Sequence, residues 1–315
     1  MTATTQGTVT FRIWTYLQER HPPAKHIPLA VLLFLGVAGF ARAVHGEATS
    51  LASVHSAIGI ASVFALLLIL RLMDEIKDRD LDLELFPERP LPAARIFESD
   101  IVFLLAATIA FYIAANIVAG PAIWSALLVL GYAFLMFVFF FVPEILRRRP
   151  ILNLATHNPI FALIALYGFG VFAAEHGHGP LDLDWAMIGL YTVMVWMPFL
   201  GWEIARKLRP AGSHDPYDIY SPVLGRRGAI ATVAFAQAIA VGIGIFLYIR
   251  LSLPDAYLAI LLIAGFLCGG ANLRFLMREV TLPKELGAAA EIFLAAILAA
   301  QIVGFALPAP GGLGS

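Results

Sequence analysis

The chain has 315 residues, of which 60% are hydrophobic and only 14% are charged, whereas soluble domains carry nearer a quarter charged residues. Its net charge of −1 gives no reason to expect nucleic acid as a partner. The single cysteine, Cys268, excludes a disulfide framework within the chain. Long apolar runs recur along the sequence, so we expect an integral membrane protein whose solvent is lipid.

Residues 1–27 do not follow this apolar pattern. A signal peptide would have a short basic start followed by an apolar core, and this segment has neither. Phe11, Trp14 and Leu17 recur at helical spacing with arginines nearby. This pattern favours either a short helix in the membrane interface or a loosely ordered tail.

Nine apolar segments follow. They cover residues 28–44, 51–72, 100–119, 121–142, 152–174, 185–202, 228–250, 256–277 and 287–307. Each must be helical, because an unpaired backbone group in hydrocarbon costs several kcal/mol. The sequence therefore predicts an all-α multi-pass membrane protein. We expect one transmembrane domain over residues 28–307, with about nine helices bundled around a central cavity, and a short tail over residues 308–315.

The basic residues predict the orientation of this bundle. Of the 21 lysines and arginines, all but Arg42 and Arg250 precede the first span or lie near connections 2–3, 4–5, 6–7 and 8–9. The positive-inside rule then places the N-terminus in the cytoplasm. The C-terminal tail falls on the other side, which agrees with an odd number of spans. We expect the cavity to open near the cytoplasmic side of a bacterial inner membrane.

An acidic stretch ends the second span. Seven acids fall among residues 71–88: Asp74, Glu75, Asp78, Asp80, Asp82, Glu84 and Glu88. Asp74, Asp78 and Asp82 are spaced i, i+4, i+8, so they share one face if the helix continues. Their charges repel one another and lie at the helix end that disfavours anions.

Such an unfavourable stripe predicts a missing cation. Carboxylate oxygens suit Mg²⁺, which usually bridges to substrate phosphates. The alternative is a solvated charged loop that Lys77, Arg79 and Arg89 neutralise. Prolines at 87, 90 and 92 stop the helix and return Arg89 and Arg95 toward the carboxylates. Arginine forks onto phosphate oxygens, which we favour for Arg89, whereas Arg95 could equally anchor to lipid headgroups.

The end of the sixth span carries a second candidate acid, Glu203. Acids near membrane depth are costly and are usually functional. Spans 2 and 6 end on the same side, so their acids can face one another across a cavity. The alternative for Glu203 is a local i, i+4 ion pair with Lys207. Asp215 and Asp218 follow in the next connection.

These residues resemble motifs of the UbiA superfamily of intramembrane prenyltransferases, and they indicate a divergent member. The family's first motif, NDxxDxxxD at the end of helix 2, reads DExxDxxxD here, over residues 74–82. An Arg-Pro-Leu-Pro stretch follows at residues 89–92, as is common in the family. The second motif, DxxxD, aligns with Glu203 and Lys207, so its second acid is lost and Asp215 or Asp218 would have to replace it.

The resemblance implies roles for particular residues. Asp74, Asp78, Asp82 and Glu203 would be catalytic. The Mg²⁺ ligands would be Asp74, Glu75, Asp78, Asp82 and Glu203, with Asp215 and Asp218. The diphosphate would be bound by Lys77, Arg89, Arg147 and Lys207, with Arg147 taken from a basic run that otherwise serves as a membrane anchor.

The implied activity is Mg²⁺-dependent transfer of a prenyl group from an isoprenyl diphosphate to an aromatic or other lipid-soluble acceptor. The expected partners are these two substrates and membrane lipid. Two alternatives stay open, a UbiA-like terpene cyclase or lyase and a non-catalytic transporter or binding protein. The acids cluster at one face and are absent from mid-span, which favours chemistry over transport. His157 could face the cavity or lie at the membrane interface.

Overall fold

The computed structural model describes residues 7–47, 52–209, 219–277 and 283–306. Helices dominate these residues, and no strand occurs among them. The predicted C-terminal tail lies outside the described ranges.

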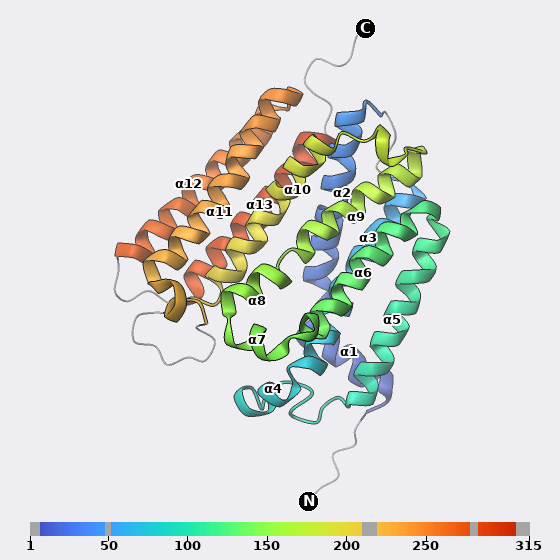
Figure 1. Ribbon diagram of the computed structural model, residues 1–315, viewed down its shortest axis with the longest axis vertical. Helices are drawn as coiled ribbons and strands as arrows, with labels where there is room; N and C mark the ends of the chain where they lie inside the picture. Colours follow the sequence, from blue (N-terminus) through green and yellow to red (C-terminus); the bar gives the residue numbers. More distant parts are fainter. Residues whose placement is uncertain (1–6, 48–51, 210–218, 278–282, 307–315) are drawn as a thin grey trace, which may run out of the picture.

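Nine helical segments in the described ranges are long and apolar enough to span a membrane, as the sequence predicts. They pack side by side as a bundle (Figure 1). The spans are α2 (Pro23–His45), α3 (Val54–Lys77), α5 (Glu98–Val118), η1 (Gly120–Ala122) with α6 (Ile123–Phe137), α8 (Pro150–His157) with α9 (Ile160–His176), α10 (Trp185–Ala205), α11 (Ser221–Leu251), α12 (Asp255–Met277) and α13 (Pro283–Ala306).

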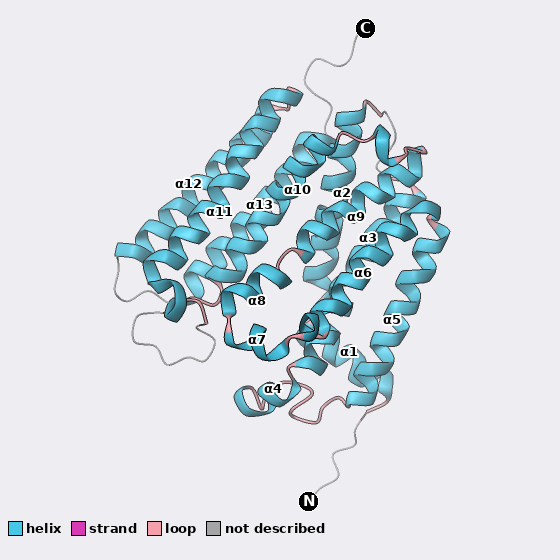
Figure 2. Ribbon diagram, viewed as in Figure 1, coloured by secondary structure: helices cyan, strands magenta, loops and turns pink. Residues whose placement is uncertain are grey.

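Short helices connect the spans. They are α1 (Val9–Arg20), α4 (Arg79–Leu85), η2 (Phe139–Phe141), α7 (Pro143–Arg148) and η3 (Pro180–Asp182). Helices α1, α4 and α7 gather at one end of the bundle, the lower end in Figure 1, which is coloured by secondary structure in Figure 2. This end therefore carries most of the non-spanning structure.

The bundle is held by close helix contacts and a buried polar network. At Gly59 on α3, an added Cβ would lie 2.0 Å from the Phe34 ring of α2, so only glycine permits this approach. Asn116 donates to Ser62 Oγ at 2.9 Å and accepts from the Tyr167 hydroxyl at 2.8 Å. These pairings join α5 to α3 and α9, and they satisfy polar groups that would be costly in lipid.

The N-terminal segment forms the predicted short helix, α1. Thr8 caps it by accepting from the Phe11 backbone N–H at 3.3 Å. Arg12 donates to both carboxylate oxygens of Asp100 at the start of α5, at 2.8 and 2.9 Å. Phe11 and Trp14 are 62% and 56% exposed. Their contact with the membrane interface remains a prediction.

Two predicted spans end differently in the structure. The fourth was expected to reach residue 142, but α6 ends at Phe137. The three phenylalanines 139–141 follow with left-handed φ values of 49°, 50° and 62°. The fifth is divided into α8 and α9. Pro159 lies at this division and has no backbone N–H to donate, so the helix ladder is interrupted there.

Candidate functional site

A cavity of about 440 Å³ opens at the end of the bundle that carries α4 and α7. Its wall comes mainly from α3, α4, α8 and α10. The charged lining residues are the acids Asp74, Asp78, Asp82 and Glu203 and the bases Arg71, Lys77, Arg89, Arg206 and Lys207. The acidic ends of spans 2 and 6 therefore share one cavity, and Lys77, Arg89 and Lys207 lie with them.

The three aspartates of the first motif line this cavity on a broken helix. Helix α3 ends at Lys77, and Asp78 takes φ −100° and ψ 12° before α4 begins. The helix on which the shared face was conditional is therefore interrupted at Asp78. The Asp78 N–H still donates to the Asp74 carbonyl at 2.9 Å, and the Asp82 N–H to the Asp78 carbonyl at 2.8 Å. These bonds preserve the i, i+4 spacing, which explains why all three residues reach the same cavity.

Asp78 differs from its neighbours in having no counterion. Lys77 Nζ lies 3.1 Å from Asp74 Oδ1, and Arg89 Nη1 lies 2.5 Å from Asp82 Oδ1. Among the charged residues of the cavity wall, Asp78 is the one that no basic group in the described ranges pairs with. Burial raises the pKa of Asp78, and the charges of Asp74 and Asp82 raise it further, against the opposing effect of Lys77. Within the described residues, Asp78 is therefore the acid of this wall that no base neutralises.

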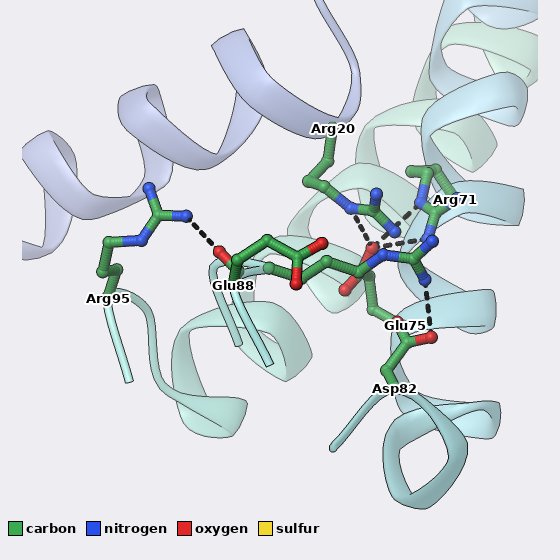
Figure 3. Close-up of polar contacts among 7 residues, drawn as sticks. Arg20, Arg71, Glu75, Asp82, Glu88 and Arg95 are labelled. Atoms are coloured by element: carbon green, nitrogen blue, oxygen red, sulfur yellow. Dashed lines mark hydrogen bonds and ion pairs between the residues drawn. The ribbon is translucent and has the colours of Figure 1, made fainter. Parts of the chain in front are cut away.

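The two arginines after α4 take different places. Arg89 turns back to the cavity, where it bonds Asp82 and lies 3.7 Å over the Phe86 ring centre. Arg95 instead pairs with Glu19 of α1 and donates to the Glu88 carbonyl at 2.7 Å (Figure 3). Arg89 therefore lies where a phosphate ligand could reach it, while Arg95 holds α1.

Glu75 lies outside the cavity wall, although the sequence suggested it as a metal ligand. Its carboxylate is buried and accepts from Arg20 Nε of α1 at 2.7 Å and from Arg71 Nη2 at 2.5 Å (Figure 3). Arg71 lines the cavity and was missed from the sequence. The signal was its i, i+4 spacing to Glu75. We therefore leave Glu75 out of the proposed metal site.

Local ion pairs neutralise Glu203 at the end of α10. Lys207 Nζ lies 2.6 Å from Glu203 Oε1, and Arg206 Nε donates to Oε2 at 2.7 Å. This is the alternative that the i, i+4 spacing left open, with Arg206 as an additional partner. Burial raises the pKa of the adjacent Tyr220, and the Glu203 charge adds to the effect. The predicted replacement acids Asp215 and Asp218 lie outside the described residues.

Arg147 lies away from the cavity wall and is exposed. Its guanidinium lies 5.0 Å from the ring centre of Phe139. Lys77 Nζ, which belongs to the wall, lies 4.9 Å from the same ring centre. Arg147 thus contacts the same ring as Lys77 but is not part of the cavity wall that the sequence suggested for it.

The carboxylates of the cavity fit a Mg²⁺ ion that shares its shell with water and phosphate better than one held by protein ligands alone. Within the described residues, no three His, Cys, Asp or Glu side chains converge to hold a metal by themselves. Proteins usually hold Mg²⁺ through one or two carboxylates, while water and substrate phosphates complete its shell. Asp74 and Asp78 suit this second arrangement.

The sequence left the position of His157 open, and the structure resolves it. His157 lines the cavity, together with Asn153 and Asn158. Asn158 accepts from Trp196 Nε1 at 2.7 Å, which fixes its side chain. The wall of α8 is therefore polar, which the apolar run of the fifth span did not predict.

The sequence matches no family model and no curated protein. Two solved structures share its fold. One is the apo structure of a UbiA homolog from Aeropyrum pernix K1, with a TM-score of 0.61 and 17% identity over 85% of this chain and 97% of that one. The other is a digeranylgeranylglyceryl phosphate synthase, studied in membranes, with a TM-score of 0.63 and 16% identity over 93% of this chain and 98% of that one.

The chain is thus an integral, all-helical membrane protein with the architecture of these two structures. The resemblance to the UbiA superfamily that its sequence motifs suggested is confirmed at the level of the fold. At such low identity the likeness establishes the fold alone, so function has to be argued from the cavity.

Proposed function

We propose that the chain is a Mg²⁺-dependent prenyltransferase that moves a prenyl group from an isoprenyl diphosphate to a hydrophobic acceptor. The observation that carries the proposal is Asp78, a half-buried carboxylate flanked by Asp74 and Asp82, for which the described chain supplies no counterion. A buried charge without a partner is costly. A bound cation would remove this cost. The fold shared with a UbiA homolog supports the same class of function.

In this proposal the metal site lies on the α3 side of the cavity. Asp74 and Asp78 would hold Mg²⁺ through their carboxylate oxygens, and Asp82 would keep Arg89 in place. The ion supplies charge stabilisation for the departing diphosphate when bound.

The basic residues of the opposite wall would bind the diphosphate. Lys207 and Arg206 are held by Glu203 at 2.6 and 2.7 Å, so they are oriented before a ligand arrives. Donors fixed in this way stabilise charge as it develops, without a reorganisation cost. We therefore assign Glu203 the role of orienting these bases and place a single metal at Asp74 and Asp78.

Apolar side chains line much of the remaining wall and would keep the prenyl chain dry. Phe161 lines the cavity and stacks on Phe199, with ring centres 3.9 Å apart and planes 7° from parallel. Ile160 and Trp202 add to this surface. Aromatic faces also stabilise a positively charged group close to them. They would therefore favour the allylic carbon as it loses diphosphate.

The proposed orientation keeps the N-terminus in the cytoplasm of a bacterial cell, with the protein in its inner membrane. The cavity mouth then faces the compartment that holds water-soluble diphosphates. The basic residues near the ends of α3, α6 and α10 support this orientation through the positive-inside rule.

The test uses purified full-length protein in lipid nanodiscs. Geranyl, farnesyl and geranylgeranyl diphosphate are each supplied with Mg²⁺ or EDTA, and diphosphate release is followed. We expect release only with Mg²⁺, and a loss of about 100-fold in Asp78→Asn, comparable with other losses of metal-site groups. Asp80→Asn is the matched control, because Asp80 is exposed, is two residues away and does not line the cavity. Metal-independent release, or an unchanged rate in Asp78→Asn, would refute the proposal.

A further inference from the structure

Two polar side chains of the cavity wall take no part in its ion pairs. Asn153 and His157 lie four residues apart on α8, so they share one face of that helix. Both line the cavity. The diphosphate site proposed above uses neither of them.

The hydrogen bonds of the His157 ring identify its free nitrogen. Nδ1 lies 3.0 Å from the Asn153 carbonyl oxygen and 3.1 Å from Thr156 Oγ1. A carbonyl oxygen only accepts, so Nδ1 carries the proton and the lone pair of the neutral ring is on Nε2. The polar contacts of Nδ1 therefore leave Nε2 as a hydrogen-bond acceptor.

Two acceptor atoms in this wall lack partners. His157 Nε2 and Asn153 Oδ1 are both buried, and neither has a hydrogen bond within the described structure. Buried polar atoms without partners are uncommon and call for an explanation, such as a ligand. Since both atoms are acceptors, the ligand that satisfies them must donate, as a hydroxyl group does.

A strained turn holds the His157 ring. The ring centres of Phe139 and Phe140 lie 5.9 and 5.8 Å from that of His157. Both phenylalanines have left-handed backbone, with φ 49° and 50°, which is rare for bulky residues. Strain of this kind persists where the surrounding structure enforces it, and it is concentrated at functional sites.

The charged surroundings of the His157 ring come from the α3 side of the cavity. The charged groups that act on the ring are Lys77 and Asp74 of α3. Arg147 of α7 contacts the Phe139 ring and does not line the cavity. His157 thus lies near Asp74 of the proposed metal site, in the cavity that both substrates would share.

We propose that Asn153 and His157 bind the hydroxyl group of the prenyl acceptor, and that His157 is the catalytic base; this inference rests on the proposed function. As the acceptor oxygen bonds to the first prenyl carbon, the bond from that carbon to diphosphate oxygen breaks and its electron pair leaves with the diphosphate. The hydroxyl proton passes to His157 Nε2 and then to water. The acceptor class is therefore a lipid-soluble alcohol or phenol that is prenylated on oxygen.

The experiment compares hydroxylated acceptors with counterparts that have no proton to give. Full-length protein in nanodiscs receives Mg²⁺, the best prenyl diphosphate, and either a long-chain alcohol, an alkylphenol or a glycerol monoether, or the matching methyl ethers. Products are identified by mass spectrometry. We expect prenyl ethers only from the hydroxylated compounds. No ether product from any of them would overturn the inference.

His157→Gln separates catalysis from structure, because an amide can accept a hydrogen bond but cannot take up the proton. We expect kcat for transfer to fall by about 100- to 1,000-fold, in the range for general base catalysis, with the acidic limb of the pH–rate profile lost and KM little changed. The matched control is His176→Gln. His176 ends α9, far from the cavity wall, and its Nδ1 lies 2.9 Å from the Phe172 carbonyl oxygen, as that of His157 lies near the Asn153 carbonyl. It should transfer at the wild-type rate.

The outcomes distinguish this inference from the function beneath it. If His157→Gln lowers Tm but leaves kcat and the pH profile unchanged, His157 only stabilises the α8 wall of the cavity and the inference fails. Binding of farnesyl thiodiphosphate, a poorly ionising analogue, reports the proposed function separately. It should need Mg²⁺ and be unchanged in His157→Gln. If the wild-type protein does not bind the analogue in the presence of Mg²⁺, the proposed function is refuted.

Discussion

The ends of α3 and α10 face the same cavity with opposite charge balance. At the end of α3, three aspartates line the wall and Asp78 has no counterion in the described chain. At the end of α10, a single acid, Glu203, has two bases within 2.7 Å. In the described residues, one acid at the end of α3 has no basic partner, whereas the acid at the end of α10 is paired twice.

The difference indicates a division of labour between the two ends. A cation belongs at α3, because the acids there repel one another without it. An anion belongs at α10, where Lys207 replaces the second acid of the family motif. In the proposed function a metal–diphosphate pair would satisfy both ends at once, so one metal would be sufficient.

The largest expected effect concerns Glu75, an acid at the end of α3 that lies outside the cavity wall. In Glu75→Gln, Arg20 and Arg71 lose the buried carboxylate that joins them. Breaking a buried ion pair from one side costs about 3–5 kcal/mol, so the unfolding free energy in detergent should fall by about this amount. Glu203→Gln is the comparison and should cost less, because Glu203 is 17% exposed. Equal losses would mean that Glu75 is not a special structural group.

The second prediction restores the missing acid. In Lys207→Asp, the end of α10 acquires a pair of carboxylates with Glu203 and should attract a second cation. Diphosphate affinity at low Mg²⁺ should fall by about tenfold, the loss of roughly 1.4 kcal/mol, and rise more steeply with Mg²⁺ concentration. Isothermal titration with farnesyl thiodiphosphate measures both. Lys207→Met is the control, since it removes the base without adding an acid and should lose affinity at every Mg²⁺ concentration.

The third prediction uses pH to test whether Asp78 lacks a cation. Its pKa is raised in the folded protein, so the folded state holds a proton that the unfolded state has released. Without metal, the contribution of Asp78 to Tm should therefore be largest below the ordinary aspartate pKa and should be lost as pH rises through the raised value. Saturating Mg²⁺ should remove this loss, because the ion takes the place of the proton. The same pH dependence with and without Mg²⁺ would count against a metal at Asp78.

The smallest effect is expected at an exposed ion pair in the same acidic stretch. Arg79 and Glu98 lie 2.7 Å apart with their side chains 50% and 47% exposed. Exposed pairs contribute at most about 1 kcal/mol, so Arg79→Ala should leave stability and diphosphate release nearly unchanged. A large loss of release would show that the solvated charges of this stretch also serve the site.

Much of the architecture could be predicted because lipid imposes simple rules. Nine apolar runs had to be nine helices, and the structure contains nine spans in its described residues. The shared face of Asp74, Asp78 and Asp82 followed from their spacing. The Glu203–Lys207 pair was also within reach of local reasoning, because its partners are one helical turn apart.

Contacts between distant segments could not be predicted in this way. Spacing gives the face of a residue on its helix but not the neighbour that the face meets. Glu75 bonds Arg20, which is 55 residues earlier in the chain. Nothing in the sequence around Glu75 indicates this partner, so its place outside the cavity could not be predicted. The turn at 139–141 was equally hidden, since three phenylalanines at the end of an apolar run are indistinguishable from more helix.

The attachment of α1 has a consequence for biosynthesis. This helix is synthesised well before its partner, because Arg12 bonds Asp100, which is 88 residues later in the chain. At about 5–20 residues per second, the ribosome needs on the order of ten seconds to supply that partner. During this interval α1 has no folded protein to dock on. Its exposed Phe11 and Trp14 could hold α1 at the membrane surface during this time. The docking of α1 onto the bundle would then be a late step of folding.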